Sequence, residues 1–164
     1  MHRIARLAIC AVVPLTLAAS VATSGAAELD PSAVTFKLPD QIPWKDNPNN
    51  PGVKQAVLAG DPNKEGSLYV VLTKWLPGNM SRPHFHPNDR FITVVKGTWW
   101  VGSGGTYDPN ATVPMPAGTF VNHWAKGVHY DGAKDEEAII LIVGIGPATS
   151  TPFTAGSPPP NKTQ

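Results

Sequence analysis

The sequence has only one cysteine, Cys10, which lies in an apolar stretch near the N-terminus. The rest of the chain contains no cysteine, so it can form no disulfide and offers no thiolate as a nucleophile or metal ligand. No GxSxG sequence marks a nucleophilic serine. The GSGG run at 102–105 precedes no predicted helix whose N-terminus could bind a phosphate, so a tight turn explains it better. These absences argue against cysteine, serine and phosphate-loop chemistry.

Long hydrophobic runs are also scarce. The clearest one, Leu7–Ala19, has 13 residues, fewer than the roughly 20 that a membrane-spanning helix needs. It follows a positively charged start and precedes small residues, which is typical of a secretory signal peptide. We therefore expect residues 1–27 to be removed, with cleavage after Ala27 or Ala26, and the mature protein to be secreted or periplasmic. An uncleaved membrane anchor is the alternative.

Neither sign of charge dominates. The chain has 13 lysines and arginines against 12 aspartates and glutamates. Removal of Arg3 and Arg6 with the signal peptide leaves 11 basic residues and a net charge of about −1. A chain without a basic stripe is not expected to bind nucleic acid or, once the signal is removed, a membrane. The mature chain is long enough for a single domain with one core.

Helical periodicity is missing as well, because no segment keeps a sustained period of 3.6 residues. Short β-rich runs separated by glycine and proline take its place from residue 67 onward. They are Ser67–Leu76, Phe91–Val95, Thr98–Val101, Gly118–Trp124 and Ala138–Gly144. Such a series predicts an all-β sandwich or barrel over residues 67–148.

Proline-rich segments flank this β-rich part. Residues 28–66 predict an N-terminal arm, in which Ala33–Lys37 and Lys54–Leu58 are candidate edge strands. Residues 149–164 combine prolines with serine, threonine and glycine, and predict a disordered tail. The chain is thus expected to consist of a signal peptide, an arm, a barrel and a tail.

The expected mature chain has four histidines, His84, His86, His123 and His129, which fall within 46 residues of one another. Histidine is the commonest metal ligand among side chains. His84 and His86 are two residues apart, so on a strand both imidazoles lie on one face and can bind the same ion. An isolated HxH pair is a weak signal that more often marks a surface pair, here between two prolines, so its surroundings decide.

The surroundings of this pair resemble the first sequence motif of the cupin superfamily. That motif places a glycine six residues before an HxH pair and another glycine after it, as Gly78 and Gly97 do here. Gly118 and His129 have the spacing of the second motif. Trp124 and Lys126 replace the proline and the glycine that are usual there.

The resemblance extends over residues 42–148, to small, often secreted, single-domain cupins of the ChrR-like kind. The stretches that carry it are VLAGDP at 57–62, PHFHP at 83–87, TVVKGTWW at 93–100, PAGTFV at 116–121 and GIGP at 144–147. The resemblance implies an all-β fold, a double-stranded antiparallel β-helix or jelly-roll barrel. It also implies a metal ion at His84, His86 and His129, a small-molecule ligand and a homodimer.

Three imidazoles suit a divalent transition metal, and iron, manganese, zinc and nickel are all compatible with them. An ion with open positions could bind oxygen and substrate, or polarise a carbonyl group as a Lewis acid. The sequence therefore favours an exported small-molecule oxygenase or isomerase, without identifying a catalytic residue. A metal-free binding protein for a small anionic ligand is the alternative.

Arg90 is the main departure from the cupin pattern, because it stands where the motif has a ligating glutamate, and arginine cannot ligate. Three interpretations follow. Arg90 turns aside from a three-histidine ion or binds an anionic substrate, for which its planar donors are suited. Alternatively, the metal is lost and Arg90 and the histidines form an anion pocket. In the third, Asp89 supplies the carboxylate, although a shift of one residue reverses the face of a strand.

His123 and Trp99 complete the set of candidate residues. His123 is not in a ligand position of the cupin motif, so it is expected either to be an exposed or structural histidine or to line the pocket behind the ligands. Trp99 and Trp100 point to opposite faces of one strand. One could line the pocket and the other a dimer interface, or both could pack in the core.

Overall fold

The computed structural model describes residues 27–154, 156 and 157, so the predicted signal peptide lies, except for Ala27, outside the described residues. The chain divides into two units, Met1–Phe36 and Lys37–Gln164. In the first unit, the predicted strand at Ala33–Lys37 is wrong: residues 31–33 form a turn. The carbonyl of Asp30 accepts the backbone N–H groups of Ala33 and Val34, which commits these groups locally. No helix within the described ranges is long and apolar enough to cross a membrane.

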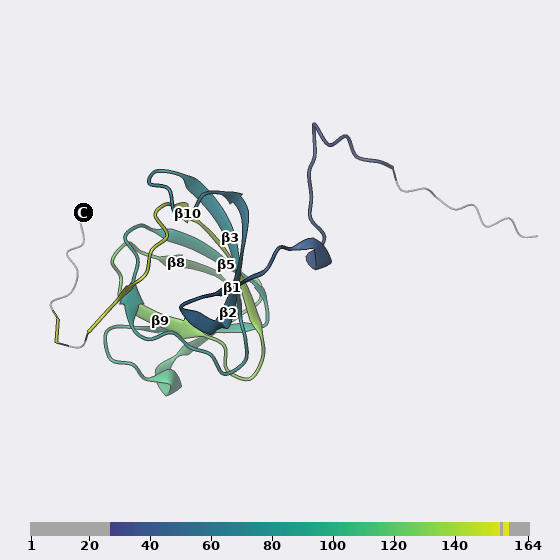
Figure 1. Cartoon of the computed structure of the whole chain (residues 1–164). Helices are drawn as coiled ribbons and strands as arrows, with labels where there is room; N and C mark the ends of the chain where they lie inside the picture. Colours follow the sequence, from purple (N-terminus) through teal and green to yellow (C-terminus); the bar gives the residue numbers. More distant parts are fainter. Residues whose placement is uncertain (1–26, 155, 158–164) are drawn as a thin grey trace, which may run out of the picture. The chain divides into compact units, whose positions relative to one another are not determined.

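The second unit folds into two antiparallel sheets (Figure 1). The larger sheet has the order β1-β2-β3-β10-β5-β8 and the smaller one the order β11-β4-β9-β6-β7. The strands of the larger sheet are β1 Lys45–Asn47, β2 Asn50–Gly60, β3 Leu68–Trp75, β5 Arg90–Lys96, β8 Phe120–His123 and β10 Ala138–Ile145. Those of the smaller sheet are β4 His84–Phe85, β6 Thr98–Ser103, β7 Val113–Pro116, β9 His129–Gly132 and β11 Thr151–Pro152. Single 3-10 turns lie at Pro39–Gln41 and Pro109–Ala111.

The chain crosses between the sheets repeatedly, which places strands distant in sequence side by side. Strand β10 lies between β3 and β5, and β9 lies between β4 and β6. Every pair of strands is antiparallel, and the predicted jelly-roll barrel is confirmed. The consequence for the site is that β4 and β9, which carry histidines, become direct neighbours.

The core follows from the alternation of side chains along each strand. On β3 and β10, every second residue is buried between the sheets, and β5 adds Ile92 and Val94. Trp99, from β6, has no exposed surface. The turn between β5 and β6 needs Gly97, which has a φ of 68° and would carry a Cβ into the carbonyl of Glu137.

Both flanks join the barrel more closely than their proline content suggests. The predicted edge strand at 54–58 is part of β2, an interior strand of the larger sheet, while β1 forms the edge. At the other end, Thr151 and Pro152 pair with β4, and the N–H of Phe153 donates to the carbonyl of Pro83. The predicted disordered tail thus begins inside the fold, because backbone pairing with β4 orders its first residues.

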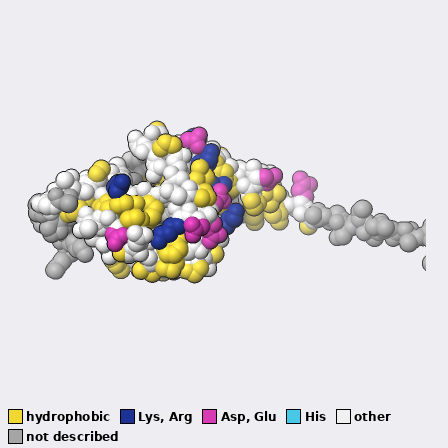
Figure 2. Space-filling view, turned by 90° about the horizontal axis from the view of Figure 1, so that it is seen from below, with side chains coloured by type: hydrophobic (Ala, Val, Ile, Leu, Met, Phe, Trp, Pro, Cys, Tyr) yellow, Lys and Arg dark blue, Asp and Glu magenta, His cyan; other side chains and the backbone are white. Residues whose placement is uncertain are grey.

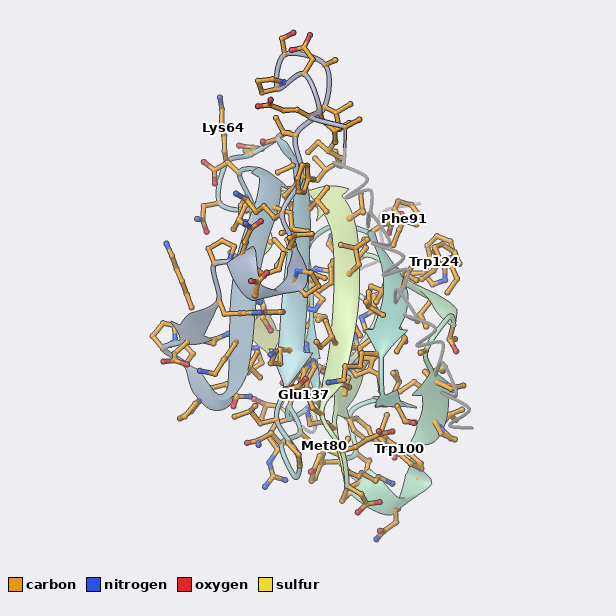
Figure 3. The ribbon with its side chains drawn as sticks, turned by 90° about the vertical axis from the view of Figure 1, so that its right-hand side faces the viewer. Lys64, Met80, Phe91, Trp100, Trp124 and Glu137 are labelled. Atoms are coloured by element: carbon orange, nitrogen blue, oxygen red, sulfur yellow. The ribbon has the colours of Figure 1, made fainter. Side chains whose placement is uncertain are left out.

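The outer face of the larger sheet carries both apolar and charged side chains. Phe91 on β5 and Trp124 after β8 are exposed and labelled in Figure 3. Glu137 lies between Lys74 and Lys96, with N–O distances of 3.5 and 3.3 Å. Figure 2 likewise shows hydrophobic side chains alternating with charged ones on the face seen from below.

Candidate metal centre

Three of the predicted site histidines converge in the structure. His84 on β4 and His129 on β9 are direct cross-strand partners, and His86 follows β4 on the same side. Their potential ligand atoms all lie within 4.8 Å of one another. Their ring centroids are 4.4 to 5.0 Å apart. His86 and His129 are buried and His84 is half-buried, so the cluster lies below the surface of the protein.

Backbone carbonyls orient all three rings. Nδ1 of His84 lies 2.8 Å from the carbonyl of Arg82, Nδ1 of His86 lies 2.9 Å from that of Thr149, and Nδ1 of His129 lies 2.9 Å from that of Gly127. A carbonyl only accepts, so each Nδ1 must carry the proton and each Nε2 is left with a lone pair. This outer arrangement is typical of histidines that bind metals, because it fixes the tautomer and the ring orientation.

The environment keeps His86, His129 and His123 neutral. Burial, together with the positive charge of Arg90, strongly lowers the pKa of His86. Burial also lowers the pKa of His129, although Asp131 opposes it, and lowers that of His123 to about 3. At neutral pH no proton competes with a cation for their lone pairs.

Arg90 lies beside the triad and contacts one of its histidines. Its Nη1 is 3.0 Å from Nε2 of His86, and its Nη2 donates to the carbonyl of Ala148 at 2.8 Å. Since a guanidinium can only donate, it uses the lone pair of His86 that an ion would need. Burial lowers the pKa of Arg90, while Tyr69 and Asp131 oppose that effect. Arg90 is therefore a competitor for the ligand nitrogen of His86.

Asp89 has a different role from the one in the third interpretation. Its Oδ1 accepts a 2.6 Å hydrogen bond from the backbone N–H of Ala125, and it belongs to neither cluster of potential ligands in the described part of the chain. The one-residue offset from Arg90 turns its side chain away from the cavity. Asp89 thus holds the loop after β8 instead of contributing a carboxylate to the histidines.

Asp131 is a residue of the site that the sequence analysis missed. It forms a second cluster with His123 and His129, whose ligand atoms are also within 4.8 Å of one another. The Ser81 hydroxyl donates to Oδ1 of Asp131 at 2.7 Å and accepts from its N–H at 2.9 Å. Burial raises the pKa of this carboxyl, but nearby histidines and Ser81 outweigh that effect and lower it. Its position two residues after His129, on the same face of a strand, was the available signal.

Trp99 and His123 meet at the inner end of the site. Trp99 is completely buried, and its ring centroid is 5.3 Å from that of His123. Trp100 points the other way, and Nζ of Lys134 lies 3.8 Å from the centroid of its ring. Trp99 therefore belongs to the core and supports His123 from behind.

His84, His86 and His123 line a cavity of about 870 Å³. Its lining combines the polar groups of His84, His86 and Arg90 with core residues such as Val71 and Ile142. A space of this size and mixed character is typical of a small-molecule site.

The donor chemistry fits a transition metal. Imidazole nitrogens suit zinc, iron, copper or nickel, whereas calcium and magnesium prefer oxygen ligands. Nε2 of His129 and of His123 are buried and have no hydrogen-bond partner, although such atoms are normally satisfied. An ion bound to the triad would satisfy the first of these atoms, so the residues present fit a divalent metal.

Comparison with known proteins yields one sequence family and several related structures. A family model described as a ChrR cupin-like domain matches residues 33–149. No curated protein matches the chain. Among solved structures, KdgF from Halomonas sp. is 21% identical, with a TM-score of 0.52 over 68% of this chain and 95% of that one.

Two further structures share the architecture. The polyketide cyclase RemF from Streptomyces resistomycificus is 14% identical, with a TM-score of 0.60 over 75% of this chain and 88% of that one. The cupin-2 domain protein Rru_A2000 from Rhodospirillum rubrum is 16% identical, with a TM-score of 0.55 over 74% and 81%. At these identities the likeness shows the fold alone, and activity has to be argued from the site.

Proposed function

The chain belongs to the ChrR cupin-like domain family, and from this premise we propose that it is a metal-dependent enzyme acting on a small anionic molecule. His84, His86 and His129 would hold one divalent transition metal, and the cavity of about 870 Å³ beside them would hold the substrate. The observation that carries the proposal is the set of three Nδ1–carbonyl hydrogen bonds, which turn three Nε2 lone pairs toward one another.

The bound ion would supply Lewis-acid activation of a substrate oxygen, or a position for dioxygen, which corresponds to isomerase or oxygenase chemistry. The protein's own residues have separate tasks. Arg90 can pair with a carboxylate or similar group of the substrate, because its planar donors fit such groups and it is half-buried in the cavity lining. The apolar part of the lining excludes water from the rest of the substrate. Neutral His86 and His129 remain available as ligands throughout the neutral pH range.

A second candidate function is supported by one observation, the 3.0 Å contact between Nη1 of Arg90 and Nε2 of His86. If that contact persists, no ion can use His86, and the cavity becomes a metal-free site for a small anion. In that case Arg90 and the histidines would bind the anion directly.

Elemental analysis of the full chain, produced without a histidine tag, distinguishes the two functions. The enzyme proposal expects about one equivalent of one transition metal in the wild-type protein and none in His86→Ala. Gln55→Ala, which changes the same cavity at a residue that belongs to neither ligand cluster, is the matched control and should keep the metal. A wild-type protein that remains metal-free after reconstitution, yet binds a carboxylate probe through Arg90 in the presence of a chelator, would establish the second function instead.

The N-terminal sequence supports export after removal of residues 1–27, and the cupin resemblance supports a homodimer. Mass spectrometry of the mature N-terminus tests the first of these proposals. Sedimentation velocity of the purified protein tests the second. A mature chain that retains its first residues, or a purely monomeric protein at micromolar concentration, would contradict them.

A further inference from the structure

Position 90, where the cupin motif has a ligating glutamate, has a histidine directly opposite on the neighbouring strand. Arg90 occupies the place of the cupin glutamate on β5, and its register partner on β8 is His123. Directly opposed residues have Cβ atoms about 4.5 to 5.5 Å apart on the same face. Both residues line the cavity. His123 is therefore the nearest inward-facing position on the adjacent strand from which another ligand could reach the same ion.

His123 is also close to the triad. Its ring centroid is 3.8 Å from that of His129, a shorter separation than any within the triad, where the values are 4.4 to 5.0 Å. A ligand atom of His123 lies within 4.8 Å of those of His129 and Asp131. The two clusters share His129, and one Nε2 can bind only one ion. A single ion between His129 and His123 would therefore use both clusters.

The hydrogen bonding of His123 points to a missing partner. Its Nε2 is buried without any partner, as is Nε2 of His129. A buried polar atom without a partner destabilises the fold. Asp131 differs, because Ser81 already donates to its Oδ1. Thus the two unsatisfied nitrogens of the second cluster belong to neighbouring imidazoles, which is the pattern expected of ligands without their ion.

We propose that His123 is the fourth protein ligand of the metal, replacing across the sheet the glutamate that the cupin motif has at the position of Arg90. The inference rests on the proposed function, since it concerns the same ion. Asp131 supplies a buried negative charge beside His123 and His129, which the absent glutamate would otherwise provide. The resulting donor set has four imidazoles and a carboxylate behind them.

Metal affinity in His123→Phe tests this assignment. Phenylalanine fills the space of the ring beside Trp99 but has no donor atom. The variant should retain one equivalent of zinc on the triad with affinity lowered at least 10-fold, and cobalt loaded in its place should give an altered visible spectrum. Asn122→Ala, whose exposed side chain lies on the other face of the same strand, should match the wild-type protein in both measurements. Unchanged affinity and spectrum in a folded His123→Phe would overturn the inference while leaving the three-histidine function intact.

A measurement on the wild-type protein avoids dependence on the folding of any variant. In protein loaded with cadmium-113, each ligating histidine nitrogen shows coupling to the metal in nitrogen-15 NMR spectra. Four coupled imidazoles are expected, and three would overturn the role of His123. A wild-type protein that takes up no metal at all would overturn the proposed function and, with it, this inference.

Discussion

The guanidinium of Arg90 lies 3.0 Å from Nε2 of His86, so a cationic side chain occupies the lone pair that a metal ion would use. The same guanidinium donates to the carbonyl of Ala148, and Thr149 orients the ring of His86 through its own carbonyl. The ligand, its competitor and the segment that follows β10 are thus held in one hydrogen-bonded network. An ion that binds Nε2 of His86 has to displace the hydrogen bond that Arg90 donates to this nitrogen.

Replacement of Arg90 by glutamine should raise the affinity for zinc about 10- to 100-fold. The change removes a charge-assisted hydrogen bond, worth about 1.5 to 3 kcal/mol, from the ligand nitrogen of His86. A competition titration with a chromophoric chelator measures the effect. Arg82→Gln is the matched control, because it removes the same charge from the cavity lining, but that guanidinium stacks on Tyr107 at 4.2 Å. Equal gains in both variants would attribute the effect to net charge instead of the contact with His86.

A small carboxylate should increase the affinity of the wild-type protein for zinc. An anion in the cavity gives Arg90 a new partner, which releases His86 for the ion, so the two ligands are expected to bind cooperatively. Zinc titrations in the presence and absence of succinate measure this coupling, for which we expect a factor of about 5 or more. In Arg90→Gln the coupling should vanish. Coupling of the same size in both proteins would mean that the anion binds the metal itself.

The metal-free protein should lose stability as the pH falls below about 6.5, the ordinary pKa of histidine. In the unfolded chain, His123 takes up a proton near pH 6.5. In the folded protein it takes up the proton only near pH 3, because burial lowers its pKa to about 3. As the pH falls from about 6.5 to about 3, the free energy of unfolding then decreases by up to about 1.4 kcal/mol per pH unit. The stabilisation that depends on neutral His123 is fully present above pH 6.5. His86 and His129, whose pKa values are also lowered by burial, act in the same direction.

Urea unfolding of chelator-treated protein at pH 7.5 and 5.5 measures this dependence. The pKa of Asp131 lies below the ordinary carboxyl range, so this group does not titrate between those two values. His123→Phe should show a shallower dependence than the wild-type protein. Equal stability of the wild-type protein at both pH values would contradict the assignment of neutral, buried histidines.

Ser81→Ala should destabilise the fold by about 2 to 3 kcal/mol. Ser81 satisfies both the carboxylate and the backbone N–H of buried Asp131, at 2.7 and 2.9 Å, and alanine would leave both groups unpaired. Thermal unfolding measures the loss. Ser32→Ala removes a similar serine–aspartate bond to Asp30, which is fully exposed, and should leave the transition unchanged. Similar losses of thermal stability in both variants would show that the effect of Ser81→Ala does not come from its hydrogen bonds with buried Asp131.

Phe153→Ala should loosen the segment that follows β10. The ring of Phe153 packs where a side chain at Gly105 would lie, next to the pairing of β11 with β4. Its removal should lower the free energy of unfolding by about 1 kcal/mol, the scale expected for a half-buried aromatic side chain, and weaken zinc binding several-fold. Urea unfolding and zinc titration measure the two effects. A lower free energy of unfolding with unchanged zinc affinity would show that this segment stabilises the fold but does not contribute to metal binding.

The barrel and the histidine triad could be predicted because their signals are local. Alternation in β3 and β10, and glycines at the turns, depend on short stretches of sequence. His84 and His86 are two residues apart, at and just after β4, and the cupin spacing added His129. Gly97 illustrates the physical basis, since its position requires a positive φ and leaves no room for a Cβ.

The remaining features depend on long-range pairing that no local pattern reports. Arg90 and His123 are opposed only because β5 pairs with β8, and Ser81 reaches Asp131 across 50 residues of sequence. The strand at Thr151–Pro152 was concealed by a composition typical of disorder. Its backbone groups pair with β4, and that tertiary contact outweighs the local preference.

Because Thr149 comes late in the chain, its carbonyl influences the order in which the histidine site is assembled. It orients His86 from a position 63 residues later in the chain, after all four histidines. During synthesis the ligands therefore exist before the group that fixes one of their rings. An ion that arrives early meets flexible imidazoles, and one that arrives after β11 has paired meets the oriented set. The site is thus completed by the closure of the barrel, so any selectivity for one metal would be a property of the finished fold.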